Sequence, residues 1–201
     1  CLCAFDDHRT LTGKQDASDI CPGSKAVPGA EDFSWTMCYV PSPTGMVLTE
    51  GAYYLNQTFC RDCYLGIISC ASDFEQSPEE NAALAEAMRR GSKIADRFEH
   101  WSFDNGATDS PYVEEVCWKP RGIQLMREFY RKKNIHIPHE QVWLFDDATA
   151  NVKAFIGWQY PWNVIEVSCG SRDCSGGGTR HCPMRTCPKC GAVANLTAHY
   201  P

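Results

Sequence analysis

The sequence lacks any long hydrophobic run. No apolar stretch approaches the roughly 18 residues of a membrane-spanning helix, so we expect no membrane span. Positive charge is also scarce, with 19 Lys and Arg against 25 Asp and Glu and a net charge of -6. An acidic chain lacks the general basic surface that holds nucleic acid, so a nucleic-acid partner is not expected. The given sequence contains no signal peptide, and we expect a mature or trimmed product.

Cysteine, by contrast, is abundant, with 13 residues in a chain of 201. A chain of this length can bury a full core without crosslinks. The cysteines therefore indicate an oxidising compartment, a metal site, or both. Acceptor sequons at Asn56 and Asn195 fit a secreted glycoprotein. We expect a secreted or extracellular protein, and the alternative is a cytoplasmic protein with structural zinc.

The C-terminal residues 169–201 are rich in Gly and Cys and show almost no periodic pattern. Their Cys-Pro-Lys-Cys-Gly stretch resembles a zinc-ribbon knuckle, in which a tight turn aims two thiolates at one metal. Disulfides that tie a loop-rich extension to the rest of the chain are the simpler interpretation, and structural Zn2+ is the alternative. Cys60-x-x-Cys63 is a distant zinc partner or a redox pair. The cysteines open to either use in the extension are Cys174, Cys182, Cys187 and Cys190.

Residues 1–168 alternate between predicted strands and helices. Apolar runs predict strands at 1–5, 64–68, 100–103, 142–145 and 163–167. Helical spacing predicts helices at 77–98, where Gly91 is a weak point, and at 120–134 and 148–157. The Gly- and Pro-rich residues 13–50 predict loops and a hairpin. The alternation predicts an α/β domain over 1–168, a Rossmann-like parallel sheet with helices on both faces, followed by the cysteine-rich extension 169–201.

Polar side chains follow three of the predicted strands. Asp6 ends the first, Ser69 follows the second, and Asp146-Asp147 follows the strand at 142–145. The carboxyl ends of parallel strands meet at one edge of a sheet, where ligands bind. Carboxylates there can hold Mg2+ through oxygen, and Lys119 with hydroxyls can hold a phosphate. This is the equipment for phosphoryl transfer by a carboxylate nucleophile.

The same residues, in this order, resemble the haloacid dehalogenase-like (HAD) superfamily. That family has an Asp-x-Asp-x-Thr motif after its first strand, a Ser or Thr after the second, then a Lys, and an Asp-Asp pair after the fourth. The resemblance runs from Cys3 to Val167. It implies a magnesium-dependent phosphohydrolase acting on a phosphomonoester. The short segments between motifs leave room for only a minimal cap, and an open site suits phosphate on a macromolecule as well as on a small molecule.

The resemblance also implies a role for each residue. Asp6 is the nucleophile and a metal ligand, Asp146 is a metal ligand, and Asp147 is a ligand or a partner of the ligands. The implied phosphate-binding set has Ser69 on the phosphoryl group, Lys119 neutralising its charge, and Thr10 supporting the loop after Asp6.

His8 departs from the family pattern, because the family has its second acid, the general acid and base, at this position. The backbone carbonyl of His8 can still bind the metal, since any residue supplies one. An imidazole, with an ordinary pKa of about 6.5, could protonate a leaving oxygen. It could equally lie at the wrong distance from that oxygen, or repel the metal. The alternative function is therefore a catalytically impaired, secreted HAD-like protein that binds a phosphorylated or anionic ligand or acts as a scaffold.

Each motif also has a plainer interpretation. Asp146-Asp147 alone would be a helix N-cap, and Lys119 alone would be a surface lysine. We assign no role to His136 or His139. The oligomeric state and the substrate are not predicted. We expect core or rim packing of the tryptophans Trp101, Trp118, Trp143, Trp158 and Trp162.

Overall fold

A computed structural model of the chain describes residues 1–7, 10–14, 25–31, 45–69, 78–94, 111–113, 118–146, 149–155 and 159–167. The predicted site residues His8 and Asp147 and the predicted glycan acceptor Asn195 lie outside the described residues, as does the whole cysteine-rich extension.

A five-stranded sheet forms the centre of the molecule, and all four of its strand pairs are parallel. Numbered along the chain, its strands lie in the order 3-2-1-4-5, which is the Rossmann order. The predicted parallel α/β sheet is therefore confirmed. In spatial order the strands are β6 (Tyr112–Val113), β5 (Tyr64–Ile68), β1 (Leu2–Asp6), β7 (Val142–Asp146) and β8 (Asn163–Glu166).

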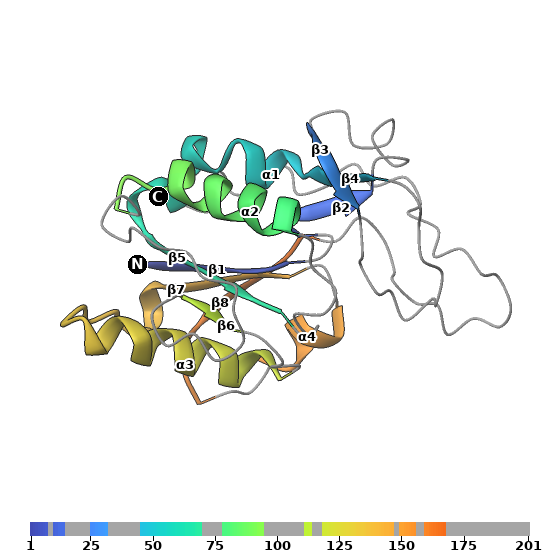
Figure 1. Cartoon of the computed structure of the whole chain (residues 1–201). Coiled ribbons are helices and arrows are strands. Elements are labelled where there is room, and N and C mark those ends of the chain that lie inside the picture. Colours follow the sequence, from blue (N-terminus) through green and yellow to red (C-terminus); the bar gives the residue numbers. More distant parts are fainter. Residues whose placement is uncertain are drawn as a thin grey trace, which may run out of the picture.

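Helices cover both faces of this sheet (Figure 1). Helices α1 (Glu50–Tyr53) and α2 (Pro78–Gly91) lie on one face, and α3 (Lys119–Lys132) and α4 (Thr149–Lys153) lie on the other. Short 3-10 turns at Leu55–Gln57 (η2), Phe59–Asp62 (η3) and His139–Gln141 (η6) complete the helical segments.

Strand β1 separates two apolar cores. Successive side chains of a strand point to opposite faces. Cys3 and Phe5 accordingly belong to the core under α1 and α2, whereas Leu2 and Ala4 belong to the core over α3. All five residues of β1 are buried, as expected of a strand that is covered on both faces.

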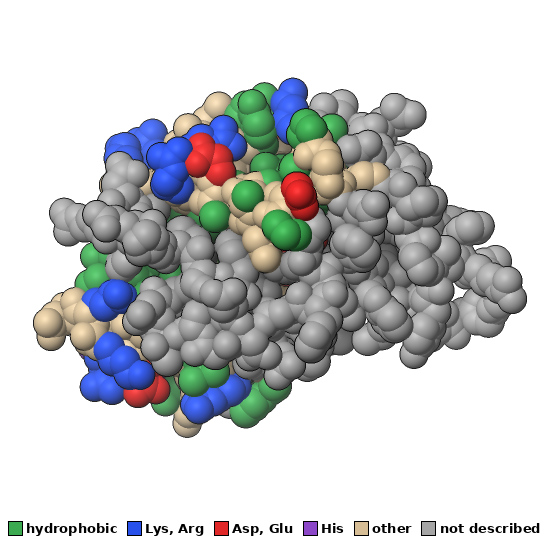
Figure 2. Space-filling model, in the orientation of Figure 1, with side chains coloured by type: hydrophobic (Ala, Val, Ile, Leu, Met, Phe, Trp, Pro, Cys, Tyr) green, Lys and Arg blue, Asp and Glu red, His purple; other side chains and the backbone are tan. Residues whose placement is uncertain are grey.

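The outward faces of the long helices are charged. Figure 2 shows Lys and Arg side chains over α2 and α3. Arg89 and Arg90 lie in the last turn of α2, and Arg131 and Lys132 in the last turn of α3. Positive charge at a helix C-terminus complements the helix dipole, so these residues stabilise their own helices.

A second, smaller sheet lies between β1 and α1 in the sequence. It is antiparallel, with the order β2-β4-β3. Its strands are β2 (Thr12–Lys14), β3 (Lys25–Glu31) and β4 (Gly45–Leu48). Figure 1 shows it beyond the carboxyl-terminal end of β1. The prediction of loops and a hairpin for residues 13–50 therefore missed one strand of this sheet.

Helix α2 ends earlier than predicted. The predicted helix to residue 98 is wrong, because α2 ends at Gly91. The chain then bonds to the segment before β5: Ser92 Oγ donates to the carbonyl of Cys63 (2.7 Å), and Lys93 N donates to the carbonyl of Arg61 (2.8 Å). A β-carbon at Gly91 would lie 2.5 Å from Leu55, so glycine permits this close approach.

The predicted third strand is not tested by the structure, whereas helix α4 ends earlier than predicted. The strand that pairs with β5 on the side away from β1 is β6, at Tyr112–Val113. The predicted strand at 100–103 lies outside the described residues. Helix α4 ends at Lys153, and Ala154 N and Phe155 N bond to carbonyls three residues back, which closes the helix before the predicted end at residue 157.

Two disulfides join the start of β1 to the segment before β5. Cys1 bonds to Cys63 and Cys3 bonds to Cys60, with Cα–Cα distances of 4.7 and 5.8 Å. The interpretation of Cys60-x-x-Cys63 as a redox pair or a zinc partner is therefore wrong, because each cysteine is bonded to a different residue of the Cys-Leu-Cys start. The pairing depends on β1 and β5 being neighbours in the sheet, which no sequence spacing reveals.

We expect the two disulfides to stabilise the fold in a non-additive way. They close nearly the same loop, with sequence separations of 62 and 57. The chain-entropy model gives about 4 kcal/mol for a loop of roughly 60 residues and about 2 kcal/mol for the short loops that a second bond adds. Cys1→Ala/Cys63→Ala should lose about 2 kcal/mol, and replacement of all four cysteines about 6 kcal/mol. Urea unfolding without reductant measures both losses, and equal losses per disulfide would contradict this account.

His139 lies at the opposite end of β7 from Asp146 and has a structural role that was not predicted. Its Nδ1 accepts a hydrogen bond from Trp162 Nε1 (2.9 Å), and its Nε2 lies 3.0 Å from an Arg127 guanidinium nitrogen. Its ring stacks on Tyr160 with centroids 3.8 Å apart. Both ring nitrogens thus face donors. Burial, and then the charge of Arg127, lower the pKa of His139 from its ordinary value.

This lowered pKa predicts a loss of stability in mild acid. The unfolded chain takes up a proton near the ordinary pKa of about 6.5, and the folded chain does so only at lower pH. The contribution of neutral His139 to the free energy of unfolding is therefore fully present above about pH 7 and declines as the pH falls through 6.5. His139→Gln, which keeps an acceptor for Trp162, should show a smaller fall in melting temperature between pH 7.5 and 5.5. The exposed His136→Gln is the control and should retain the wild-type fall.

Candidate functional site

Three charged side chains meet at the carboxyl edge of the parallel sheet. Asp6 ends β1, Asp146 ends β7, and Lys119 begins α3. Lys119 Nζ donates to Asp6 Oδ1 at 2.5 Å and lies 3.9 Å from Asp146 Oδ2. The Asp6 side chain is 8% exposed, that of Asp146 is 0% exposed, and that of Lys119 is 1% exposed. One buried ammonium group therefore contacts two buried carboxylates that come from residues 140 positions apart in the chain.

The sheet topology explains why the two acids meet. Strands β1 and β7 are parallel neighbours, and Phe5 is in register with Phe145. The two phenylalanine rings stack with centroids 4.9 Å apart, so Asp6 and Asp146 follow at the same level. The strand order reverses between these two strands, because the chain leaves β1 toward β5 and later returns to the other side. Ligands of open α/β sheets bind at such a switch point.

Lys119 is held by its backbone position and by a second acceptor. Its ammonium group also donates to the carbonyl of Ile68, the last residue of β5, at 2.7 Å. A β-carbon at Gly122 would lie 2.8 Å from the Ile68 side chain, so glycine lets α3 approach β5 closely. Gly122 is thus a positioning residue for Lys119 that the sequence reading missed, since a helical glycine does not reveal which strand it faces.

Asp146 is held by a residue of the following helix. Asn151 Nδ2 lies 3.0 Å from both carboxylate oxygens of Asp146. Asn151 belongs to α4, and it was also missed. The sequence feature that could have identified Asn151 is a polar amide five residues after an acid at the end of a strand. The capping interpretation of Asp146-Asp147 stays open for Asp147, which lies outside the described residues.

The chain after Asp6 turns back sharply. The carbonyl of Asp7 faces the N–H groups of Thr10, Leu11 and Thr12 at 3.2, 2.8 and 3.1 Å. The carbonyl of Thr10 in turn accepts from Thr49 Oγ1 at 2.7 Å. Because Thr49 is also the N-cap of α1, these bonds tie the loop to that helix. These bonds use the backbone of Thr10, and the supporting role expected of its side chain stays a prediction.

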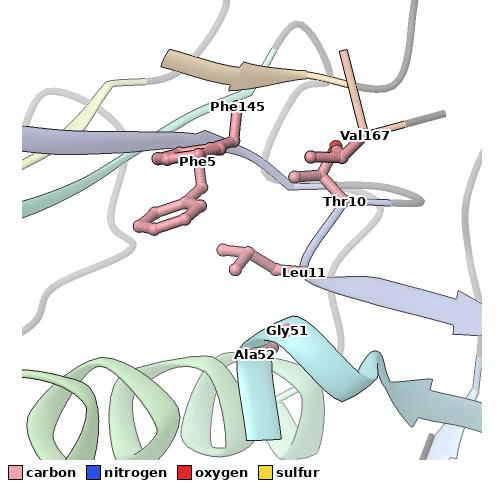
Figure 3. A pocket seen from close by; sticks show the side chains of 7 residues that line it. All are labelled: Phe5, Thr10, Leu11, Gly51, Ala52, Phe145 and Val167. Atoms are coloured by element: carbon pink, nitrogen blue, oxygen red, sulfur yellow. The ribbon is translucent and has the colours of Figure 1, made fainter. Parts of the chain in front are cut away.

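A small apolar pocket lies below this loop. Figure 3 shows Thr10 beside Val167, with the stacked rings of Phe5 and Phe145 on one side and α1 on the other. Thr10 is 4% exposed, so its hydroxyl lies within the fold. The pocket is lined by Phe5, Thr10, Leu11, Gly51, Ala52, Phe145 and Val167.

Ser69 directly follows β5 and is buried, at the same edge as Asp6. The structure therefore brings Asp6, Lys119 and Asp146 into contact and puts Ser69 and Thr10 on adjoining segments. Their catalytic, substrate-binding and metal-binding roles stay predictions.

The donor chemistry of this edge suits magnesium. Asp6 and Asp146 offer carboxylate oxygens, the ligands that Mg2+ prefers. Within the described ranges, no group of three or more His, Cys, Asp or Glu residues could hold a metal ion. The remaining expected ligands, Asp147 and the carbonyl of His8, lie outside those ranges.

Comparisons with protein-family models, curated proteins and solved structures return no match for this chain. Of the helices that the structure describes, none is both long and apolar enough to cross a membrane. The case for a function therefore depends on the residues and geometry described above.

We expect Lys119 to contribute strongly to the stability of the fold. Removing one partner of a buried ion pair leaves an uncompensated charge and costs about 3–5 kcal/mol. Lys119→Met, which keeps most of the side-chain volume, should lose this much stability at pH 7 in denaturant unfolding. The double variant Lys119→Met/Asp6→Asn removes one of the two carboxylate charges and should recover a large part of the loss. A single variant as stable as wild type would show that Lys119 does not neutralise these acids.

Proposed function

We propose that this chain is a HAD-type, magnesium-dependent phosphohydrolase that uses Asp6 as the nucleophile on a phosphomonoester. One observation supports the proposal above all others: two buried carboxylates from neighbouring parallel strands share the ammonium group of Lys119 at the switch point of the sheet. Burying these charged groups costs much free energy, and a purely structural contact could use apolar side chains instead. Buried charges of this kind cluster at functional sites.

The proposed reaction has two steps. A carboxylate oxygen of Asp6 attacks the phosphorus, and the bond to the leaving oxygen breaks as that oxygen takes up a proton. A water molecule then attacks the phosphorus of the aspartyl phosphate, which releases inorganic phosphate and restores Asp6.

The other residues stabilise the charge that moves during these steps. Lys119 offers its ammonium to the phosphoryl oxygens, and Ser69 offers a hydroxyl. Mg2+, held by Asp6, Asp146, Asp147 and the carbonyl of His8, would add positive charge against the same oxygens. Asn151 keeps the Asp146 carboxylate oriented.

His8 is the proposed proton donor to the leaving oxygen, because it occupies the family's acid position. Its identity also favours the second candidate function. If the imidazole cannot transfer the proton, the same site would bind a phosphorylated or anionic ligand without turning it over, and the chain would act as a binding module or scaffold.

The proposed location is extracellular. Two disulfides support it, because such bonds persist in oxidising compartments. Asn56 is exposed in η2 and is thus accessible for a glycan. The alternative proposal is a cytoplasmic protein whose extension holds structural Zn2+. The proposed partner is a phosphorylated small molecule or macromolecule.

Hydrolysis of p-nitrophenyl phosphate tests this function. We expect turnover that needs Mg2+ and falls about 10³-fold or more in Asp6→Asn, because the nucleophile is lost. Asp62→Asn is the matched control, since Asp62 is an exposed acid paired with Arg61 and Lys93. Release of phosphate should be followed between about pH 5 and 8, the range in which an imidazole titrates. If wild type is inactive throughout while His8→Asp gains turnover, the binding-module function replaces the enzymatic one.

A further inference from the structure

A group of positive side chains lies over the C-terminal end of α2, although the whole chain has a net charge of -6. They belong to the Lys and Arg side chains that Figure 2 shows over α2. All five are exposed, and they come from β3, η3, α2 and the residues just after α2. This basic strip consists of Lys25, Arg61, Arg89, Arg90 and Lys93.

The acids beside the basic strip neutralise only part of its charge. Glu86 pairs with both arginines of α2, at 2.6 and 3.3 Å. Asp62 pairs with Arg61 and with Lys93, each at 3.1 Å. In the part of the chain that the structure describes, the five cations form ion pairs with these two acids alone. Five positive and two negative charges therefore sum to +3.

An aromatic ring holds two of these cations in place. Lys25 Nζ lies 5.6 Å and Arg90 Cζ 5.4 Å from the centre of the Tyr53 ring. Such a ring attracts a cation without cancelling its charge. The dipole of α2 accounts for the two arginines in its last turn, whereas the other three cations belong to other segments. The surface thus gathers more positive charge than its helix needs.

The basic strip lies at the end of the sheet away from the candidate site (Figure 1). Ser92, which directly follows α2, bonds to the carbonyl of Cys63, and Cys63 is joined to Cys1 just before β1. Asp6 is the last residue of β1. Four steps of about 3.3 Å place it about 13 Å from the first residue of the strand. A partner on the basic strip would therefore not cover the candidate site.

We propose that the basic strip binds a sulfated polysaccharide. This inference goes beyond the phosphohydrolase function and uses only the proposed extracellular location, where such polymers are common polyanions. Three of the five cations are arginines, whose planar guanidinium groups match the oxygens of oxyanions. A flexible chain of repeated sulfates can follow cations that are spread over several elements. A membrane surface fits less well, because interfacial binding also uses apolar side chains. The one exposed large hydrophobic side chain of the described residues, Trp118, begins α3 on the other face of the sheet.

Binding to heparin, a highly sulfated polysaccharide, tests this proposal. Lys25→Gln/Arg90→Gln/Lys93→Gln leaves each acid of the strip with one arginine and changes the charge of the strip from +3 to 0. We expect this variant to bind a heparin octasaccharide about tenfold more weakly than wild type in low salt. Its melting temperature should stay close to that of wild type, because exposed substitutions change stability little.

Arg131→Gln/Lys132→Gln/Lys153→Gln is the matched control, because it removes three exposed charges from the other face of the sheet. It should bind heparin about as tightly as wild type. Equal weakening in the two variants would assign the binding to overall charge and overturn the proposal.

The salt dependence of wild type tests the proposal without any variant. The logarithm of its association constant for heparin should fall with the logarithm of the NaCl concentration, with a slope of about -2 to -3.5 for three to five contacts. No binding to heparin, or a slope near zero, would overturn the proposal. Tighter binding to an oligonucleotide or to phosphatidylserine vesicles would replace the polysaccharide with that partner. Hydrolysis of p-nitrophenyl phosphate should be the same in wild type and both variants, so the two proposals can fail separately.

Discussion

The contact between one buried ammonium group and two buried carboxylates constrains the rest of this fold. Asp6 and Asp146 end adjacent parallel strands, so their charges lie at one level and repel each other. Neither could stay ionised and buried without a cation nearby. Lys119, at the start of α3, supplies that cation. Gly122 and Asn151 help to position the three charged groups. Gly122 lets α3 approach β5, and Asn151 fixes the carboxylate of Asp146.

Strand β1 is held at both of its ends. Two disulfides tie its first residues to the segment before β5, and Lys119 links its last residue to α3 and to the carbonyl of Ile68. Between these ends the strand has parallel neighbours on both sides. The position of Asp6 is thus fixed by covalent bonds, by the sheet and by an ion pair. The proposed nucleophilic role of Asp6 would need such a fixed position, because small displacements reduce the rate of a reaction steeply.

The sequence predicted the central strands well because fully buried parallel strands are continuous apolar runs. Val142–Asp146 is an example, and its strand-end acid could be assigned to the ligand edge once the sheet was taken as parallel. The features that were missed depend on partners distant in the sequence. Gly91 lets the end of α2 approach Leu55 closely, and Cys60 and Cys63 pair with Cys3 and Cys1 because β5 lies beside β1. His139 likewise acquires its role from Arg127, Trp162 and Tyr160, which no local pattern brings together.

The charge of the site bears on both candidate functions. Two carboxylates and one ammonium group sum to a net charge of -1 in these described side chains. A phosphoryl group is itself anionic, so it would be repelled at short range unless further positive charge were bound. A divalent cation would bring the net charge of these three side chains to +1. We infer that catalysis and simple anion binding need the same metal, and that they differ in one respect only. Catalysis also needs a proton for the leaving oxygen, and in the proposed mechanism that proton comes from the His8 imidazole in place of a carboxylic acid.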